Sequence, residues 1–241
     1  MRIDKLLSNC GFGSRKEVKS ILKSGIVSVN GQIISDGKVH VDPTIDDIRV
    51  GSEKVEYKKF VYIMMNKPPG VISATEDDWE RTVVDLLSFE YTKYNPFPVG
   101  RLDKNTVGLL LLTNDGQLAH RLLSPKKHVE KTYFAIIDGP VTEKDRIQFA
   151  KGVCLDDGYV TKPAKLTINK SELDRSEIEL TITEGKFHQV KRMFEAVHKK
   201  VIFLKRLSMG SLYLDEDLPE GSYRELTAEE IQRLRSSVGL E

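Results

Sequence analysis

The chain has 241 residues, of which 39% are hydrophobic and 30% are charged, and its formal net charge is +1 at pH 7. This composition excludes a largely disordered chain, and the near-neutral total by itself indicates no polyanionic partner. No run approaches the ~20 apolar residues of a membrane helix. The first residues also lack the apolar segment of a secretion signal, so we expect no membrane partner and a cytoplasmic location.

The charges are unevenly distributed along the chain. Residues 1–25 contain six Lys/Arg and two Asp/Glu, residues 184–206 contain seven and two, and residues 213–241 contain three and eight. Such local basic patches attract a polyanion even when the total charge is balanced. The two cysteines, Cys10 and Cys154, lack metal-ligand spacing and are expected to be reduced thiols.

The N-terminal segment predicts a small basic module. After a short first helix carrying Ile3, residues 14–25 predict a second helix, because Ser14 and Glu17 fit a capping box. The dipeptide Asn30-Gly31, flanked by alternating apolar residues, is typical of a hairpin turn. The basic side chains of the second helix are Arg15, Lys16, Lys19 and Lys23. They form either a solvated helix face or a surface that contacts RNA phosphates.

A larger body follows this module. Residues 41–60 mix charges with one Pro and one Gly, and we interpret them as the end of the module and a linker, so that the predicted domains are 1–60 and 61–241. Short strands and helices then alternate irregularly, which predicts an α+β body with a mixed, mainly antiparallel sheet. The expected strands are 61–67, 108–113, 131–137, 164–168 and 176–183, and the expected helices are 116–123 and 188–198.

Most standard catalytic motifs are missing from the sequence. It contains no phosphate-binding GxxxxGK[ST] loop, no GxGxxG and no GxSxG, and its five histidines are not at metal-ligand spacing. The acidic run 76–80 has the residue types of a Mg²⁺ site but is better interpreted as a solvated loop. We therefore expect no metal and no small-molecule cofactor.

Asp103 is the carboxylate in the most suggestive setting. It follows Arg101 by two positions, which in an extended segment places both side chains on one side, and it precedes the apolar run 109–112. A neighbouring cation favours the ionised carboxylate in a desolvated site. Tyr133 supplies an aromatic ring, a suitable platform for a flipped base. The alternatives remain that Asp103 caps a turn and that Tyr133 belongs to the core.

Residues 184–192 provide two further cations for such a site. In "EGKFHQVKR", Lys191 and Arg192 fall in the first turn of a predicted helix. They either complete a site with the carboxylate or lie on a solvated helix face.

Four blocks carry a resemblance to a known family. "GRLDKNTVGLLLLTNDG" resembles the signature of the bacterial RNA pseudouridine synthases, in the branch that includes RsuA, and "MNKPPGVISAT", "SPKKHVEKTYFA" and "EGKFHQVKRMFEAV" match the other blocks in order. The N-terminal segment resembles the small alpha-L RNA-binding module that this branch carries. Within the branch, "EGKFHQVKRMF" and the C-terminal tail resemble the enzyme of small-subunit ribosomal RNA more than its large-subunit relatives.

The resemblance implies roles for individual residues. It makes Asp103 the catalytic aspartate, with Arg101 in the same signature, Tyr133 the ring that stacks on the target base, and Lys191 the basic partner of the aspartate. Arg192 is then an adjacent RNA-contacting candidate, and the basic helix becomes an RNA-binding surface formed by Arg15, Lys16, Lys19 and Lys23.

The implied function is the isomerisation of one uridine of small-subunit (16S) ribosomal RNA to pseudouridine, on free RNA or on an assembly intermediate, by a monomeric enzyme. Three alternatives remain at this stage. The first is a pseudouridine synthase of large-subunit ribosomal RNA. The second is a ribosome-assembly RNA-binding factor without catalysis. The third, an N-glycosidase, is disfavoured because such hydrolases normally use a second carboxylate.

Overall fold

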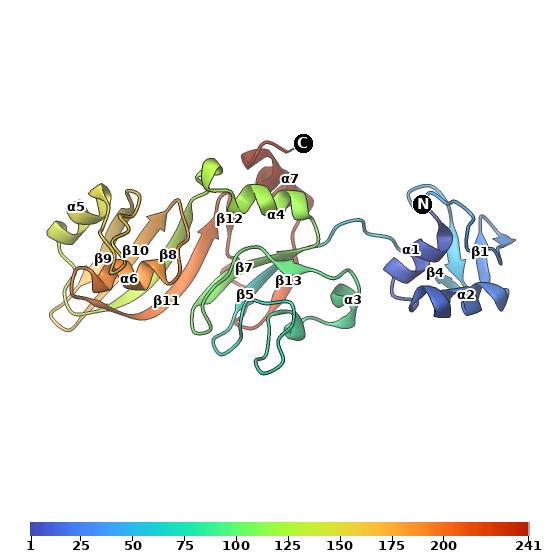
Figure 1. Cartoon of the computed structure of the whole chain (residues 1–241), viewed down its shortest axis with the longest axis horizontal. Helices are drawn as coiled ribbons and strands as arrows, with labels where there is room; N and C mark the ends of the chain where they lie inside the picture. Colours follow the sequence, from blue (N-terminus) through green and yellow to red (C-terminus); the bar gives the residue numbers. More distant parts are fainter. Residues whose placement is uncertain (241) are drawn as a thin grey trace. The chain divides into compact units, whose positions relative to one another are not determined.

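The computed structural model describes residues 1–240 and divides them into two compact units (Figure 1). The first unit comprises Met1–Val61 and also Ser88–Asn95, and the second comprises Tyr62–Leu87 and the chain from Pro96 onward. The expected boundary after residue 60 did not include the return of residues 88–95 to the first unit. Packing between segments far apart in the sequence produces this return, and no local pattern encodes it.

The first unit consists of short helices packed on a small sheet. Its four strands are in the order β2-β1-β3-β4. Its elements are α1 (Ile3–Asn9), α2 (Arg15–Lys23), β1 (Val27–Val29), β2 (Gln32–Ile33), β3 (Ile48–Val50), β4 (Glu53–Lys54) and the distant α3 (Phe89–Thr92). The apolar faces of α1, α2, β1 and β3 form its core, which includes Ile3, Leu6, Leu7, Val18, Leu22, Val27 and Ile48.

Local sequence signals account for two features of this unit. The Ser14 hydroxyl accepts a hydrogen bond from the Glu17 backbone N–H, and the Glu17 carboxylate accepts one from the Ser14 N–H at 2.7 Å, so the predicted capping box is present. Asn30 and Gly31 both have positive φ values, 51° and 81°, in the turn between β1 and β2. Such a pair of left-handed residues forms the tight turn that an Asn-Gly hairpin predicts.

Residues 41–60, interpreted from the sequence as the end of the module and a linker, contribute two strands to the sheet of the first unit. Strand β3 pairs antiparallel with β1, and β4 pairs with β3, so residues 48–54 complete the sheet of the first unit. These strands are three and two residues long, too short for an alternating pattern to stand out among charged neighbours.

The second unit is organised around a nine-stranded sheet. The strand order is β13-β5-β7-β11-β8-β10-β9, with β12 on β11 and β6 on β7. Among the strands described in this sheet all pairings are antiparallel except that between β7 and β11, which confirms the predicted mixed, mainly antiparallel α+β fold. The strands are β5 (Tyr62–Lys67), β6 (Phe97–Pro98), β7 (Val107–Thr113), β8 (Lys131–Asp138), β9 (Lys165–Ser171), β10 (Arg175–Ile182), β11 (Lys200–Met209), β12 (Leu212–Tyr213) and β13 (Tyr223–Glu225).

Helices and two 3-10 turns pack around this sheet. They are η1 (Val84–Leu86), α4 (Gly116–Leu123), η2 (Pro125–Lys127), α5 (Glu143–Lys151), α6 (Gln189–Glu195) and α7 (Ala228–Ser237). Phe149 of α5 and Phe194 of α6 are fully buried, with ring centroids 4.9 Å apart, so these two helices share one core. Helix α6 contacts β11 and α5 contacts β9. This packing fixes the position of the α6 N-terminus.

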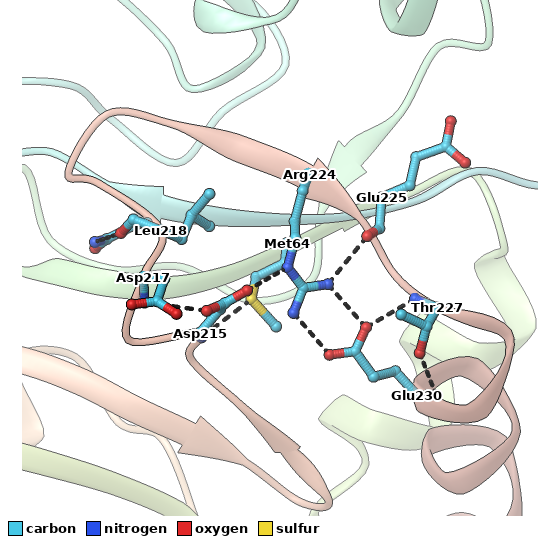
Figure 2. A network of polar contacts seen from close by, with 9 residues as sticks. Met64, Asp215, Asp217, Leu218, Arg224, Glu225, Thr227 and Glu230 are labelled. Atoms are coloured by element: carbon cyan, nitrogen blue, oxygen red, sulfur yellow. Dashed lines mark hydrogen bonds and ion pairs between the residues drawn. The ribbon is translucent and has the colours of Figure 1, made fainter.

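An arginine between two carboxylates anchors the C-terminal helix (Figure 2). Arg224 of β13 donates to Asp215 at 2.7 Å and, through both terminal nitrogens, to Glu230 at 2.8 and 2.9 Å. These bonds, that to Glu230 above all, raise the pKa of Arg224 above its usual value. Glu230 also forms the capping box of α7 with Thr227. The C-terminal helix is thereby tied to the edge strand next to β5.

The described part of the chain contains no helix of sufficient length and apolarity to cross a membrane. In the same residues no three acidic, histidine or cysteine side chains gather as metal ligands, and residues 76–80 are exposed.

Candidate active site

Asp103 lies in the loop between β6 and β7, and a buried lysine stabilises this loop by hydrogen bonds to its carbonyls. The Lys67 ammonium is fully buried at the end of β5 and donates three hydrogen bonds of 3.0 Å, to the carbonyls of Pro68, Lys104 and Thr106. Two of these carbonyls lie in the loop just after Asp103. Burial lowers the pKa of Lys67 to about 8, against an opposing effect of Asp103. The first sequence block, "MNKPPG", therefore supports the loop of the second.

A glycine sets the distance between the loop and the strand beside it. Gly108, the second residue of β7, has φ +97°, and a Cβ at this position would lie 2.4 Å from the carbonyl oxygen of Arg206. No larger residue fits without moving the backbone of β11. The parallel pairing of β7 with β11 thus depends on this glycine in "NTVGLLLL".

Both oxygens of the Asp103 carboxylate face nitrogen atoms. Oδ2 accepts a hydrogen bond from Lys191 Nζ at 2.7 Å, and Oδ1 lies 3.4 Å from His188 Nε2. The Thr106 hydroxyl approaches Oδ2 at 3.4 Å. The Asp103 side chain is 27% exposed, so the carboxylate is held in place yet remains accessible from the cavity.

Asp103 and Tyr133 line the same cavity of about 80 Å³. Tyr133 lies on β8, is 8% exposed and is directly opposite Leu180 of β10. The cavity is also lined by Arg101, Leu102, Thr106, Ile182, Gly185, Lys186, His188, Gln189, Val190, Lys191 and Leu204. The predicted residues Asp103, Tyr133, Lys191 and Arg101 therefore meet at one place.

Two of the predicted cations have different surroundings from those expected. Arg101 lines the cavity and is exposed, but among the described residues it forms no ion pair with Asp103. Arg192 turns away from the cavity and pairs with Asp156 and Asp157, the latter at 2.7 Å, which raises its pKa. Because consecutive helix positions are about 100° apart, only one of Lys191 and Arg192 can face Asp103.

The basic side chains predicted for RNA contact in the first unit are all exposed. They are Lys16, Lys19 and Lys23 of α2, on the side of the helix away from the buried Val18 and Leu22, and Arg15 in its first turn. They form no ion pair with a carboxylate among the residues described. The exposure of these side chains fits both a solvated helix face and a surface that contacts RNA phosphates.

Sequence reasoning missed one residue of the site and undervalued another. His188 was set aside as an isolated histidine, yet it precedes α6 in a left-handed conformation with φ 48° and stacks on Phe187 with ring centroids 3.8 Å apart. Its position before a basic helix turn was the available signal. Lys67 stands in the block "MNKPPGVISAT" without an assigned role, and its three hydrogen bonds around the Asp103 loop give it a supporting one.

The arrangement suits chemistry on a nucleoside. One ionisable carboxylate, oriented by an ammonium and an imidazole, faces a cavity with an aromatic ring in its wall. Such a site can act on a sugar carbon or take a proton, while the ring supports a base taken out of its stack.

Comparisons with known proteins agree with this geometry. Residues 61–196 match the family model described as RNA pseudouridylate synthase, and residues 1–45 match the S4 domain. An uncharacterized RNA pseudouridine synthase (YtzG) of Bacillus subtilis (strain 168) is 55% identical over 234 residues, covering 97% of this chain and 98% of that protein. A solved structure titled "Crystal structure of pseudouridylate synthase" has 37% identity and a TM-score of 0.68, over 97% of this chain and 99% of that one.

Two further relatives have different named targets. Ribosomal small subunit pseudouridine synthase A of Yersinia pestis is 40% identical, with 99% of this chain and 98% of that protein covered. Ribosomal large subunit pseudouridine synthase B of Bacillus subtilis (strain 168) is 41% identical, with 98% and 96% covered.

The two family matches and these relatives define the class of protein as an RNA-modifying isomerase with an S4 domain. The chain belongs to the RNA pseudouridylate synthase family. The resemblance found in its sequence blocks is thereby confirmed.

Proposed function

We propose that this enzyme converts one uridine of small-subunit (16S) ribosomal RNA to pseudouridine, with Asp103 as its catalytic residue. The observation that carries the catalytic assignment is the Asp103 carboxylate in the cavity, oriented by Lys191 at 2.7 Å. The small-subunit assignment is supported by the block "EGKFHQVKRMF" and by the relative from Yersinia pestis, although a relative named for the large subunit is equally similar.

The reaction is an isomerisation in which atoms balance within the substrate. The bond between N1 of uracil and C1′ of ribose breaks, the base turns, and a bond between C5 and C1′ forms. The proton on C5 is lost and N1 gains one. Asp103 acts in one of two ways. As a nucleophile it bonds to C1′ while the bond to N1 breaks, and C5 then displaces it. As a base it removes a proton from the sugar carbon next to C1′ and returns it when the bond from C5 to C1′ forms. Both routes need the carboxylate ionised when the substrate enters.

Tyr133 and Lys191 have supporting roles in this proposal. The ring of Tyr133, in the wall of the cavity, stacks on the turned base, a contact worth about 1–3 kcal/mol per base. Lys191 orients the Asp103 carboxylate and balances its charge. Arg101, exposed at the cavity and free of a carboxylate partner among the described residues, contacts the RNA of the target nucleotide.

The two parts of the chain divide the work. We assign residues 1–60 to RNA capture through the basic face of α2, and residues 61–241 to catalysis. Phosphate contacts of this kind supply affinity and orientation without reading the sequence. The enzyme acts as a monomer in the cytoplasm, on free ribosomal RNA or on a small-subunit assembly intermediate.

The deciding experiment maps pseudouridine in both ribosomal RNAs from cells with and without this protein. We expect one uridine of 16S RNA to lose its modification in the deletion strain and to regain it with wild-type protein but not with Asp103→Asn. Loss of a site in 23S RNA instead would assign the enzyme to the large subunit. Unchanged maps combined with a ribosome-assembly defect that Asp103→Asn rescues would indicate the non-catalytic assembly factor.

A further inference from the structure

A second cavity adjoins the one that holds Asp103. Its volume is about 230 Å³, and it shares Gly185 and Lys186 with the first. It lies between the end of α4, the start of β8 and the loop that follows β10. Its other lining residues are Leu123, Ser124, Pro125, Lys131, Tyr159, Lys162, Thr183 and Glu184.

Lys131, at the first position of β8, lines this cavity with much of its bonding capacity unused. Its ammonium can donate three hydrogen bonds, but among the described residues it donates one, to the Val129 carbonyl at 2.9 Å. It forms no ion pair there. A half-buried ammonium with so few partners is an unfavourable arrangement in the free protein.

A second buried cation, Arg206, adds to the free-energy cost of burying the Lys131 ammonium. Arg206 is 2% exposed, donates from Nε to the Leu109 carbonyl at 2.8 Å, and has a terminal nitrogen without a partner in the described part of the chain. Burial first, and then the charge of Arg206, lower the pKa of Lys131 to about 8. Two desolvated cations without an acidic partner favour the binding of an anion beside them.

Glu184 is the carboxylate that the structure describes in the wall of this cavity. It makes no direct contact with the Lys131 ammonium and so does not neutralise its charge. Glu184 accepts hydrogen bonds from the Tyr159 hydroxyl at 2.6 Å, from the Lys162 backbone N–H at 2.9 Å and from the Gln189 side chain at 2.8 Å. Its oxygens are thus engaged by neutral donors, while Lys186 lies over the Tyr159 ring at 4.5 Å. Lys131, Lys162 and Lys186 leave the cavity with an excess of positive charge.

We propose that this second cavity binds a backbone phosphate of the RNA, next to the uridine held at Asp103, with Lys131 as its principal donor. The inference rests on the proposed function, because the shared residues Gly185 and Lys186 place the two cavities side by side along one substrate strand. Ammonium groups with free donors are suited to a phosphate as point charges. The contact fixes the register of the strand and carries no sequence information.

The test compares Lys131→Met with Lys165→Met in the full-length enzyme. Lys165 of β9 is exposed next to the buried Leu166, so it points to the sheet face opposite to that residue and serves as a charge-matched control. The probe is unmodified, transcribed 16S ribosomal RNA. For Lys131→Met we expect about tenfold weaker binding at moderate salt and a plot of log affinity against log salt that is flatter by about 0.7–0.9. Lys165→Met should match wild type.

Ethylation of RNA phosphates before binding identifies the contact itself. Wild-type enzyme should reject RNA ethylated at a phosphate adjacent to the modified uridine, and Lys131→Met should lose discrimination at that position alone. If Lys131→Met does not fold, the double variant Lys162→Met/Lys186→Met is used and should weaken the same interference. Thermal unfolding of Lys131→Met should be unchanged or shifted upward, because a poorly satisfied cation is removed.

Two results would overturn the inference. One is an unchanged salt dependence and ethylation pattern in Lys131→Met or in the double variant. The other is a destabilised Lys131→Met with normal RNA binding, which would make Lys131 a structural residue bonded to Val129. A wild-type enzyme that forms no pseudouridine in either ribosomal RNA would contradict the proposed function instead, so the two failures are distinguishable.

Discussion

Lys191 Nζ donates to Asp103 Oδ2 at 2.7 Å across 88 residues of sequence. The contact joins the loop before β7 to the first turn of α6, and each partner is held by its own support. Lys67 bonds two carbonyls of the loop just after Asp103, and the buried Gln189 side chain bonds the Lys186 N–H and Glu184 at the other end. The carboxylate is therefore oriented before any substrate arrives, as the proposed catalysis by Asp103 requires.

Replacing Asp103 by Asn should abolish pseudouridine formation and leave folding and RNA binding intact. The amide keeps the size of the side chain but can neither attack a carbon nor take a proton. The measurement is pseudouridine yield in transcribed 16S RNA, with thermal unfolding and RNA affinity as controls. Turnover within about tenfold of wild type, a barrier change of only about 1.4 kcal/mol, would falsify the assignment.

Tyr133 should tolerate Phe in RNA binding but not Ala. The Phe ring keeps the stacking surface, whereas Ala removes a contact of about 1–3 kcal/mol and also opens a space in the cavity wall, where Tyr133 is 8% exposed. Affinity and single-turnover rate are measured for both variants. Normal binding with lost turnover in Tyr133→Phe would give the hydroxyl a chemical role, and wild-type behaviour of Tyr133→Ala would show that the ring does not stack on the substrate.

Lys67→Met should destabilise the protein and reduce activity further than stability alone explains. It leaves the carbonyls of Pro68, Lys104 and Thr106 without their donor, and we expect a loss of about 2–4 kcal/mol in the free energy of unfolding. The matched control is Lys104→Met. Lys104 is nearly half exposed and pairs with Glu80, a surface ion pair worth about 0–1 kcal/mol. Urea unfolding of the two variants checks this, and equal losses would contradict the role of Lys67.

These residues show how far sequence reasoning reaches. The capping box of α2, the Asn-Gly turn and the strand of four leucines in β7 are local patterns, so their positions were predictable. The return of residues 88–95 to the first unit and the pairing of β3 with β1 depend on contacts between distant segments. Lys191 and Arg192 carry the same charge one position apart, and only the packing of α6 decides which of them faces Asp103.

The basic face of α2 should contribute to RNA affinity through charge alone. Changing Lys16, Lys19 and Lys23 to Glu should flatten the dependence of log affinity on log salt by about 0.7–0.9 for each phosphate that the helix no longer binds. A control triple with the same charge change uses three exposed lysines of the second unit. These are Lys144, Lys151 and Lys165. Identical slopes for wild type and both triples would indicate that α2 faces solvent and that the RNA is held elsewhere.

Lys131 should make RNA binding pH-dependent near pH 8. Its pKa is lowered from the usual 10.5 to about 8, chiefly by burial and then by Arg206, with Glu184 opposing. As the pH rises through 8 the free protein loses this proton, while a bound phosphate favours the charged form. Wild-type affinity should therefore fall more steeply than that of Lys131→Met, and binding at about pH 8.5 should take up protons.

As the pH rises, the lowered pKa of Lys131 makes RNA affinity fall, but it makes the folded protein more stable. Between about pH 8 and 10.5 the unfolded chain keeps the Lys131 proton that the folded protein has lost, so this residue's contribution to the free energy of unfolding increases with pH. The pKa of Lys67 is also lowered to about 8, but Lys67 is present in both wild type and Lys131→Met. The difference in the free energy of unfolding between the two proteins therefore reports the titration of Lys131. Affinity and urea unfolding measured from about pH 7 to pH 9.5 at constant ionic strength provide the test. Parallel curves for the two proteins in both measurements would show that Lys131 does not titrate in this range.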